Sequence, residues 1–230
     1  MRSRQPWVSL RDLVNWDVYL LDLKTRREQL LAEHAGAPTW STDGKSVFFQ
    51  RRGVEFVERD LSTGKERVLF RSAEKGLPAG VTLYEPSLST DRKQLAVTLR
   101  GSRRMTAILN ATGTLRDTGD GCHLTWAPED RFVYWISKGG VMQNQVYRRE
   151  RGGGAAVSWL DLPAPFSHEY FPKLNRDGRY LVLGASAGGH EHDVADYEIF
   201  LWRVGEPADQ ALRLTFHSGN DNWPDIFTEE

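Results

Sequence analysis

Short apolar runs separated by polar turns follow one another along the chain, and no segment has the pattern of a long amphipathic helix. In residues 38–49, a Pro and a Trp precede an Asp-Gly turn, and a β-branched and aromatic run follows it. Asp-Gly supplies the positive φ of a tight hairpin turn, and β-branched and aromatic residues favour strands. The pattern therefore predicts a pair of antiparallel strands, with the Pro at the start of the first strand.

The same pattern returns at residues 86–97, 124–135 and 172–183. A third strand is expected after each copy, at 54–61, 105–110, 145–149 and 197–203, and a short fourth strand follows. Four antiparallel strands in each unit of about 40–50 residues are typical of a β-propeller blade. The large apolar anchors, which are expected on a buried sheet face, are 48, 38 and 48 residues apart: Trp40, Leu88, Trp126 and Leu174.

The motif Trp-Ser-x-Asp-Gly-Lys at residues 40–45, with Asp-Val-Tyr-Leu-Leu-Asp-Leu at 17–23 and Leu-Thr after it, resembles the TolB-like (WD40-like) propeller repeat. The resemblance covers nearly the whole chain. It implies a propeller fold and does not imply one function, because such propellers serve as scaffolds, enzyme domains and accessory domains. Copies two and three have Arg92 and Asp130 in place of the turn glycine, so their turns are expected to be looser or of another type.

The fold predicted is all-β, a single propeller domain over residues 1–230. Its blades are expected at 34–81, 82–119, 120–167 and 168–217, with a fifth blade shared by 218–230 and 1–33. In the shared blade, 222–227 is the first strand, Pro6–Leu10 the second, 16–23 the third and 28–31 the fourth. Closure by the two termini removes exposed sheet edges. Five blades are fewer than the six that the resemblance implies, so an open fragment and strand exchange between two chains are alternatives.

The net charge, the length of the apolar runs and the single cysteine limit which partners and cellular locations are expected. A net charge of −1 and a pI near 6.6 argue against nucleic acid or a membrane surface bound through bulk charge. No apolar run of about 18 residues is present, so no membrane insertion is expected. Cys122 is the only cysteine, which excludes a disulfide within the chain. No signal peptide is recognised, so the chain as given is expected in the cytoplasm, or in the periplasm if a signal was removed.

Two motifs near residue 190 suggest chemistry only weakly. Gly184-Ala185-Ser186-Ala187-Gly188 matches the Gly-x-Ser-x-Gly nucleophile elbow, but a strand is expected after it where an elbow needs a helix. The segment that follows is best explained as a solvated polar loop, and a divalent metal site is the alternative, with three weak candidate ligands: His190, His192 and Asp193. No cofactor is otherwise expected.

The strongest candidate site follows from position in the repeat. Residues near the beginning of each first strand are expected at the mouth of the central channel, where loops of several blades converge. This channel-mouth set could bind a cation, a sugar or a peptide end, or its members could only satisfy local backbone groups: His34, Glu85, His123, His168, Glu169, Tyr170, Asp221, Asn222 and Trp223.

The leading functional hypothesis is a non-catalytic binding or scaffold propeller, because no catalytic motif is assembled. Its partner is expected to be a protein, and a small ligand is possible. The alternative is a metal-assisted lyase or hydrolase at the channel mouth, and the sequence leaves glycoside hydrolysis by paired carboxylates open. A third hypothesis is an accessory propeller whose catalytic partner is encoded separately.

Overall fold

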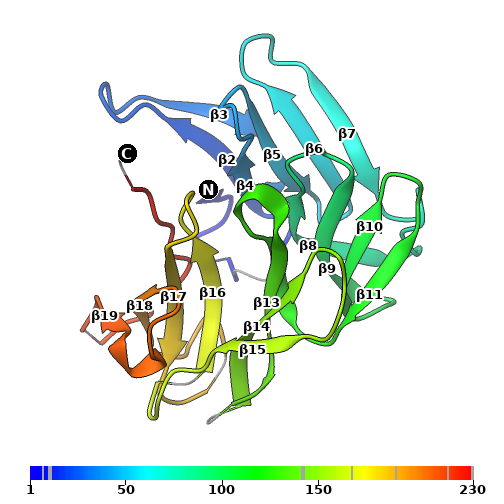
Figure 1. The fold of residues 1–230 in the computed structure, drawn as a ribbon. Coiled ribbons are helices and arrows are strands. Elements are labelled where there is room, and N and C mark those ends of the chain that lie inside the picture. The colour runs from blue at the N-terminus through cyan, green and yellow to red at the C-terminus, as the bar shows by residue number, and fades with distance from the viewer. Residues whose placement is uncertain are drawn as a thin grey trace. The chain divides into compact units, whose positions relative to one another are not determined.

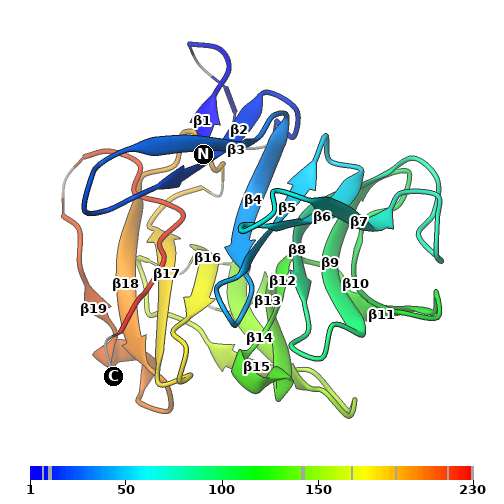
Figure 2. The ribbon, with the colours of Figure 1, turned by 90° about the horizontal axis from the view of Figure 1, so that it is seen from above.

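The computed structural model describes residues 1–6, 8–9, 12–140, 143–166, 168–189, 191–216 and 218–228. The chain divides into two compact units. Unit 1 comprises Met1–Pro86 and Asp91–Asp117, and unit 2 comprises Ser87–Thr90 and Thr118–Glu230. Both units consist of antiparallel sheets, whose strands are labelled in Figures 1 and 2.

Unit 1 contains one three-stranded sheet, one four-stranded sheet and most of a second four-stranded sheet. The three-stranded sheet has the order β1-β2-β3, and the others follow the chain as β4-β5-β6-β7 and β8-β9-β10-β11. The strands are β1 (Arg2–Ser3), β2 (Trp16–Leu21), β3 (Glu28–Ala32), β4 (Ala35–Trp40), β5 (Ser46–Arg51), β6 (Glu55–Asp60), β7 (Glu66–Arg71), β8 (Val81–Leu88), β9 (Gln94–Gly101), β10 (Met105–Asn110) and β11 (Leu115–Gly119).

Unit 2 contains two further four-stranded repeats, which a single parallel residue pair, Asn144 with His168, joins into one sheet. Its core lies between them and includes Tyr134, Leu162, Leu181 and Tyr197, all buried. The elements are β12 (Cys122–Trp126), η1 (Pro128–Asp130), β13 (Phe132–Gly139), β14 (Gln143–Glu150), β15 (Val157–Leu160), β16 (His168–Leu174), β17 (Tyr180–Ser186), β18 (Tyr197–Arg203), η2 (Ala208–Gln210) and β19 (Leu212–Arg213). No helix in the described parts of the chain is long and apolar enough to cross a membrane.

The predicted all-β architecture and its strand order are confirmed. Four repeats have the meander order first, second, third, fourth strand, and the third strands β10 and β18 have the expected bounds. The shared blade differs, because Arg2–Ser3 pairs with β2 where Pro6–Leu10 was expected; Trp7 and Leu10 of that expected strand lie outside the described residues. Residues 220–228 are in no strand. Five blades, their boundaries, ring closure and the single domain therefore stay predictions.

The tight turns depend on one residue with positive φ. Gly44 and Gly178 have φ values of 69° and 72°. Arg92 occupies the corresponding position with a φ of 62°, so this turn keeps the positive φ without glycine, contrary to the expectation of a looser turn. The turn of the third copy is different, as predicted: it contains η1, with Glu129 and Asp130 both at positive φ.

A β-bulge lies within the first strand of three repeats. Two consecutive residues face one residue of the second strand: 37 and 38 face Phe49, 123 and 124 face Trp135, and 171 and 172 face Leu183. The first bulge residue has a left-handed conformation that non-glycine residues rarely adopt. The same conformation occurs at the corresponding place of every repeat, and we call these five the left-handed residues: Ala37, Glu85, His123, Phe171 and Trp223, with φ between 45° and 58°.

Two of the three bulges contain a proline, Pro38 in β4 and Pro172 in β16. Pro38, Pro86 and Pro172 are inside β4, β8 and β16, and not at the strand starts as predicted. A bulge tolerates Pro because the extra residue is left out of the ladder. The two tryptophan anchors, which stand three residues after the first residue of their bulges, differ in burial. Trp40, expected on a buried face, is 56% exposed, whereas Trp126 is buried.

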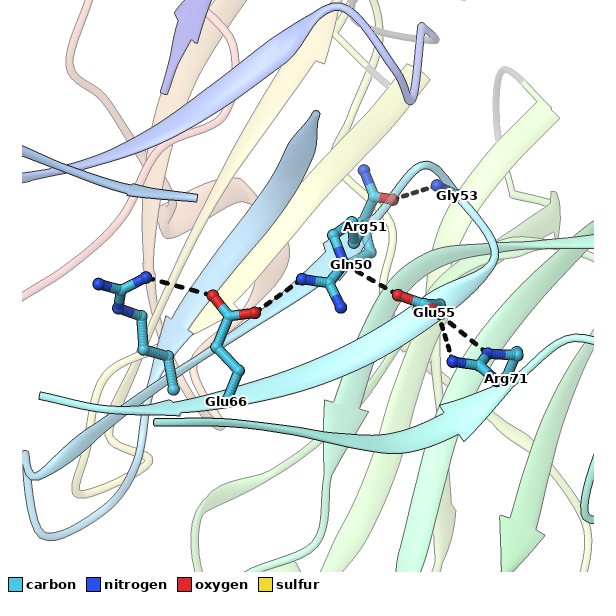
Figure 3. A network of polar contacts seen from close by, with 7 residues as sticks. Gln50, Arg51, Gly53, Glu55, Glu66 and Arg71 are labelled. Atoms are coloured by element: carbon cyan, nitrogen blue, oxygen red, sulfur yellow. Dashed lines mark hydrogen bonds and ion pairs between the residues drawn. The ribbon is translucent and has the colours of Figure 1, made fainter. Parts of the chain in front are cut away.

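In the β4–β7 sheet, opposite charges alternate across strands β5 to β7 (Figure 3). Glu55 accepts hydrogen bonds from Arg51 and Arg71, at 2.8 and 2.9 Å. Glu66 accepts from Arg51 at 2.7 Å and from Arg59 at 3.2 Å. Partial burial opposes ionisation of Glu55, but the two arginines outweigh it and hold its pKa below the usual value. These partly exposed pairs stabilise the outer strands weakly and keep them charged.

The bulge geometry predicts that Ala37→Gly stabilises the protein. A left-handed conformation costs an alanine roughly 1–2 kcal/mol and glycine almost nothing, while glycine loses more backbone entropy, so we expect a net gain of about 0.5 kcal/mol in the free energy of unfolding. The measurement is urea unfolding. The matched control is Ala35→Gly in the same strand, which should lose about 1 kcal/mol because Ala35 is fully buried and has no positive φ. Equal losses in both variants would contradict the left-handed assignment.

Candidate functional site

Three left-handed residues of unit 2 converge at one point. Ring centroids of His123 and Phe171 are 5.1 Å apart, those of Phe171 and Trp223 4.8 Å, and those of His123 and Trp223 6.0 Å. They come from β12, from β16 and from the segment after β19, 48 and 52 residues apart in sequence. Within unit 2, the repeated backbone conformation therefore places one side chain of each of three segments at a common location.

Two more rings complete the group, which we call the ring cluster: His123, Tyr170, Phe171, His192 and Trp223. His192 lies 4.6 Å from Tyr170, 5.0 Å from Phe171 and 6.0 Å from His123, between ring centroids. His123, Tyr170 and Phe171 are buried, whereas His192 and Trp223 are half-buried. The cluster thus has a buried part, formed by His123, Tyr170 and Phe171, and a partly exposed part. The imidazole of His192 and the indole of Trp223 form the exposed part.

Backbone and amide hydrogen bonds hold the exposed side in place. The side chains of Asn220 and Asn222 both donate to the carbonyl of His192, at 2.6 and 3.0 Å. The amide of Asp221 donates to the carbonyl of Tyr197 at 2.9 Å. A Cβ atom on Gly184 would lie 3.3 Å from the ring of Phe171 and 3.7 Å from the carbonyl of Asp221, so a glycine permits this close approach. Figure 2 shows the red C-terminal segment returning along β16 to β18.

The three channel-mouth residues of β16 do not share one environment: Tyr170 lies in the ring cluster, whereas His168 and Glu169 lie outside it. Tyr170 joins the ring cluster, and its hydroxyl accepts a hydrogen bond from Asn144 at 3.4 Å. His168 is buried at the start of β16 and pairs with Asn144 and Ser186 in the sheet. Glu169 accepts a hydrogen bond from the backbone amide of Leu162 at 2.6 Å, through Oε1. Glu169 therefore contributes to the connection that follows β15 and not to the ring cluster.

Glu169 is an acid with a strongly raised pKa. It is fully buried, and its Oε2 has no hydrogen-bond partner within the described parts of the chain. Burial raises the pKa of Glu169 to about 8; the amide bond from Leu162 opposes this rise, and the nearby Asp161 adds to it. The carboxyl group is thus largely protonated at neutral pH.

The predicted members in unit 1 have local roles. The Nδ1 atom of His34 lies 2.9 Å from the carbonyl of Val14, and the His34 amide donates to Asp17 at 3.0 Å. Glu85 is one of the left-handed residues, half-buried in β8. Within unit 2, the structure brings together His123, Tyr170 and Trp223 of the channel-mouth set, with Asp221 and Asn222 beside them. A single ring of all nine residues stays a prediction.

The metal candidates receive limited support. His190 lies outside the described residues. His192 faces His123 and aromatic rings, and Asp193 is half-buried in the same loop. No group of three His, Cys, Asp or Glu side chains suited to a metal ion occurs in the part of the chain that the structure describes. Ser186 ends β17, is buried and donates to the carbonyl of Gly189 at 2.6 Å, and a strand follows it, as the propeller interpretation expects.

Sequence reasoning missed Phe171 as a site residue, and it placed His192 only among weak metal ligands. In a regular strand, Tyr170 and Phe171 would face opposite sides. The bulge lets both contact His123, His192 and Tyr197. The available signal was the proline: Pro follows the left-handed residue in two of the three bulges, at Ala37-Pro38 and Phe171-Pro172, and also follows Trp223.

No protein-family model and no curated protein matches the sequence. Solved structures do match. TolB from Acinetobacter baumannii has a TM-score of 0.70 and 17% identity over 92% of this chain and 52% of its own. A putative TolB from Agrobacterium tumefaciens has a TM-score of 0.66 and 17% identity over 90% and 72%. An oligogalacturonate lyase in complex with manganese has a TM-score of 0.59 and 18% identity over 87% and 59%.

The chain therefore has a TolB-like β-propeller fold. It spans about half the length of the Acinetobacter protein, 52%, and 59% of the lyase. Identities of 17–18% show a common fold only. Since one fold is shared by TolB proteins and a lyase, the fold does not decide between binding and catalysis.

Burial of Glu169 predicts a stability that falls as pH rises. Between pH about 4.5 and 8 the folded state retains a proton that the unfolded state has released. The free energy of unfolding should therefore decrease with rising pH by up to about 1.4 kcal/mol per unit from this group and level off above pH 8. Glu169→Gln should remove that component in urea unfolding measured at several pH values. The exposed Glu129→Gln is the control and should keep the wild-type slope; a wild-type slope in Glu169→Gln would exclude this assignment.

Proposed function

We propose that this protein is a non-catalytic binding propeller whose ring cluster contacts a segment of a partner protein. The observation that carries the proposal is the convergence of His123, Phe171 and Trp223 from three repeats, each in a costly left-handed conformation. Backbone strain of about 1–3 kcal/mol per residue is retained where the surrounding structure or a function requires it.

The chemistry of the cluster suits recognition. Trp and Tyr side chains contribute large rigid contact areas and dominate the binding energy of many protein interfaces. Trp223 is half-buried, and its Nε1 is buried without a hydrogen-bond partner in the described parts of the chain, so the exposed part of the indole offers apolar contact area to a ligand. The asparagine bonds to His192 hold the exposed side rigid before binding, which lowers the entropic cost of association.

Trp223→Ala should weaken binding of peptides that are selected from a displayed peptide library against the wild-type protein. Loss of a central aromatic anchor costs about 2 kcal/mol or more, so we expect at least a roughly 30-fold rise in Kd by fluorescence anisotropy. The control is Trp40→Ala, an exposed tryptophan of unit 1, which should leave Kd unchanged. Failure to enrich any peptide, or equal Kd values for Trp223→Ala and wild type, would reject the ring cluster as the binding surface.

The second candidate function is a metal-assisted lyase or hydrolase. Two observations favour it: the similar lyase structure holds manganese, and this chain places the imidazoles of His123 and His192 with ring centroids 6.0 Å apart. Imidazole suits several divalent transition metals. The binding module ranks first because no third metal-ligating group joins this pair in the described part of the chain.

Metal content and a melting curve with and without chelator separate the two functions. A binding propeller should contain no stoichiometric metal, and its Tm should not change on chelation. The metal-assisted alternative requires about one metal ion per chain, a lower Tm with chelator, and loss of the metal in His192→Ala but not in His34→Ala.

A further inference from the structure

The last strand of unit 2 has an inverted polarity pattern. In residues 212–216 the apolar side chains point outward and the polar ones inward. Leu212, Leu214 and Phe216 are 62%, 50% and 72% exposed, and we call them the edge stripe. Arg213 and Thr215, between them, are half-buried. A strand at a sheet edge normally does the opposite, because exposed apolar edges promote unwanted pairing.

A buried carboxylate fixes this orientation. Glu198 on β18 is 2% exposed and accepts hydrogen bonds from Arg213 Nη2 at 2.6 Å and Thr215 Oγ1 at 2.5 Å. Thr215 Oγ1 also accepts from the amide of Ile199 at 2.9 Å. A shift of one residue would exchange Arg213 for a leucine and leave Glu198 buried without its cation, which is strongly unfavourable. The edge stripe is therefore held outward by the charge beneath it.

The backbone of this edge is also open. Among the described strands, β19 pairs only with β18, and the amide of Leu214 donates to Ile199 at 2.7 Å. In an antiparallel ladder, the main-chain groups of the neighbouring Arg213 then point away from β18. The carbonyl of Thr215 on that side accepts from Arg213 Nε at 2.7 Å. An added strand would thus meet the N–H and C=O of Arg213 beside the edge stripe.

Two other outer strands, β7 and β11, are protected by charge. On β7, Glu66 pairs with Arg51 and Arg67 pairs with Glu58, at 2.7 and 2.8 Å. On β11, Arg116 and Asp117 are exposed. Outward charges of this kind prevent edge-to-edge pairing, and the edge stripe contains none. The difference shows that the outer position of a repeat does not by itself require an apolar edge.

The size of the stripe favours a short occupant. Three side chains exposed to this degree present on the order of 300 Å² of apolar surface. A stable dimer needs about 800 Å² from each partner. An extended segment that adds one strand needs less area, because its main-chain hydrogen bonds supply affinity and its alternate side chains supply specificity. Arg213, which lies 4.6 Å from the ring of Phe166 and 4.7 Å from that of Phe216, holds the stripe's last aromatic in position.

We propose that β19 is a docking edge for an extended segment of a partner protein with apolar residues at alternate positions. The segment pairs its main chain with Arg213 and packs its apolar side chains against Leu212, Leu214 and Phe216. This surface is formed by β19 and the residues after it, so the inference goes beyond the function proposed for the ring cluster and does not depend on it.

The test uses two labelled nine-residue peptides, one with valine and threonine alternating and one with proline at its centre. We expect saturable binding of the alternating peptide alone, by fluorescence anisotropy. Leu214→Lys should weaken it at least about tenfold, which is the loss of one well-packed apolar contact. The control Val157→Lys changes an exposed residue of the outer strand β15 and should alter Kd less than twofold. Circular dichroism and Tm confirm that both variants fold.

Three results would overturn the proposal. The first is equal binding of the two peptides, which would show contact without strand pairing. The second is no saturation by the alternating peptide up to about 1 mM. The third is a concentration-dependent dimer of the wild type that Leu214→Lys abolishes in sedimentation velocity, which would make a second copy the occupant. Leu214→Lys should bind the peptides selected for the ring cluster with the wild-type Kd, so a failure of the docking edge and a failure of the ring cluster are distinguishable.

Discussion

The left-handed conformation at the first bulge residue is the constraint on which much of this structure depends. It recurs at Ala37, Glu85, His123, Phe171 and Trp223, residues that share neither size nor charge. This conformation is unfavourable for a residue other than glycine, so the pairing of the surrounding strands must stabilise it. In return, two consecutive residues face one partner, so the strand can bring neighbouring side chains such as Tyr170 and Phe171 into one cluster.

Two buried glutamates of unit 2, Glu198 and Glu169, have different hydrogen-bond partners. Glu198 has a guanidinium and a hydroxyl group as partners, and this arrangement orders residues 212–216. Glu169 has one backbone amide and no cation, so burial favours its neutral form. The first group organises an edge through ionic hydrogen bonds, whereas the second makes the folded state sensitive to pH. Unit 1 instead keeps its arginine–glutamate pairs at the partly exposed outer strands.

The repeated strands could be predicted from the sequence, because alternating apolar and polar residues and the turn residues are local signals. It placed β10 and β18 at their observed bounds, and it named His123, Tyr170 and Trp223, whose rings the structure brings into one cluster. It could not give the register, because one extra residue in β16 changes which side chains face together, and so Phe171 was missed. Arg2–Ser3 was missed as the partner of β2 because two residues carry no periodicity. Glu169 was placed in the channel-mouth set, although its contact with Leu162 depends on a connection that the sequence does not fix.

The recurring left-handed position has a consequence for how such a chain can diversify. Its geometry is set by backbone pairing and, in most repeats, by the following proline, while the side chain itself varies from a methyl group to an indole. Substitution at His123, Phe171 or Trp223 therefore changes the chemistry of the ring cluster and leaves the strand pairing as it was. Repeat proteins of this type can acquire new ligands by exchanging a few residues, one in each repeat, on an inherited scaffold.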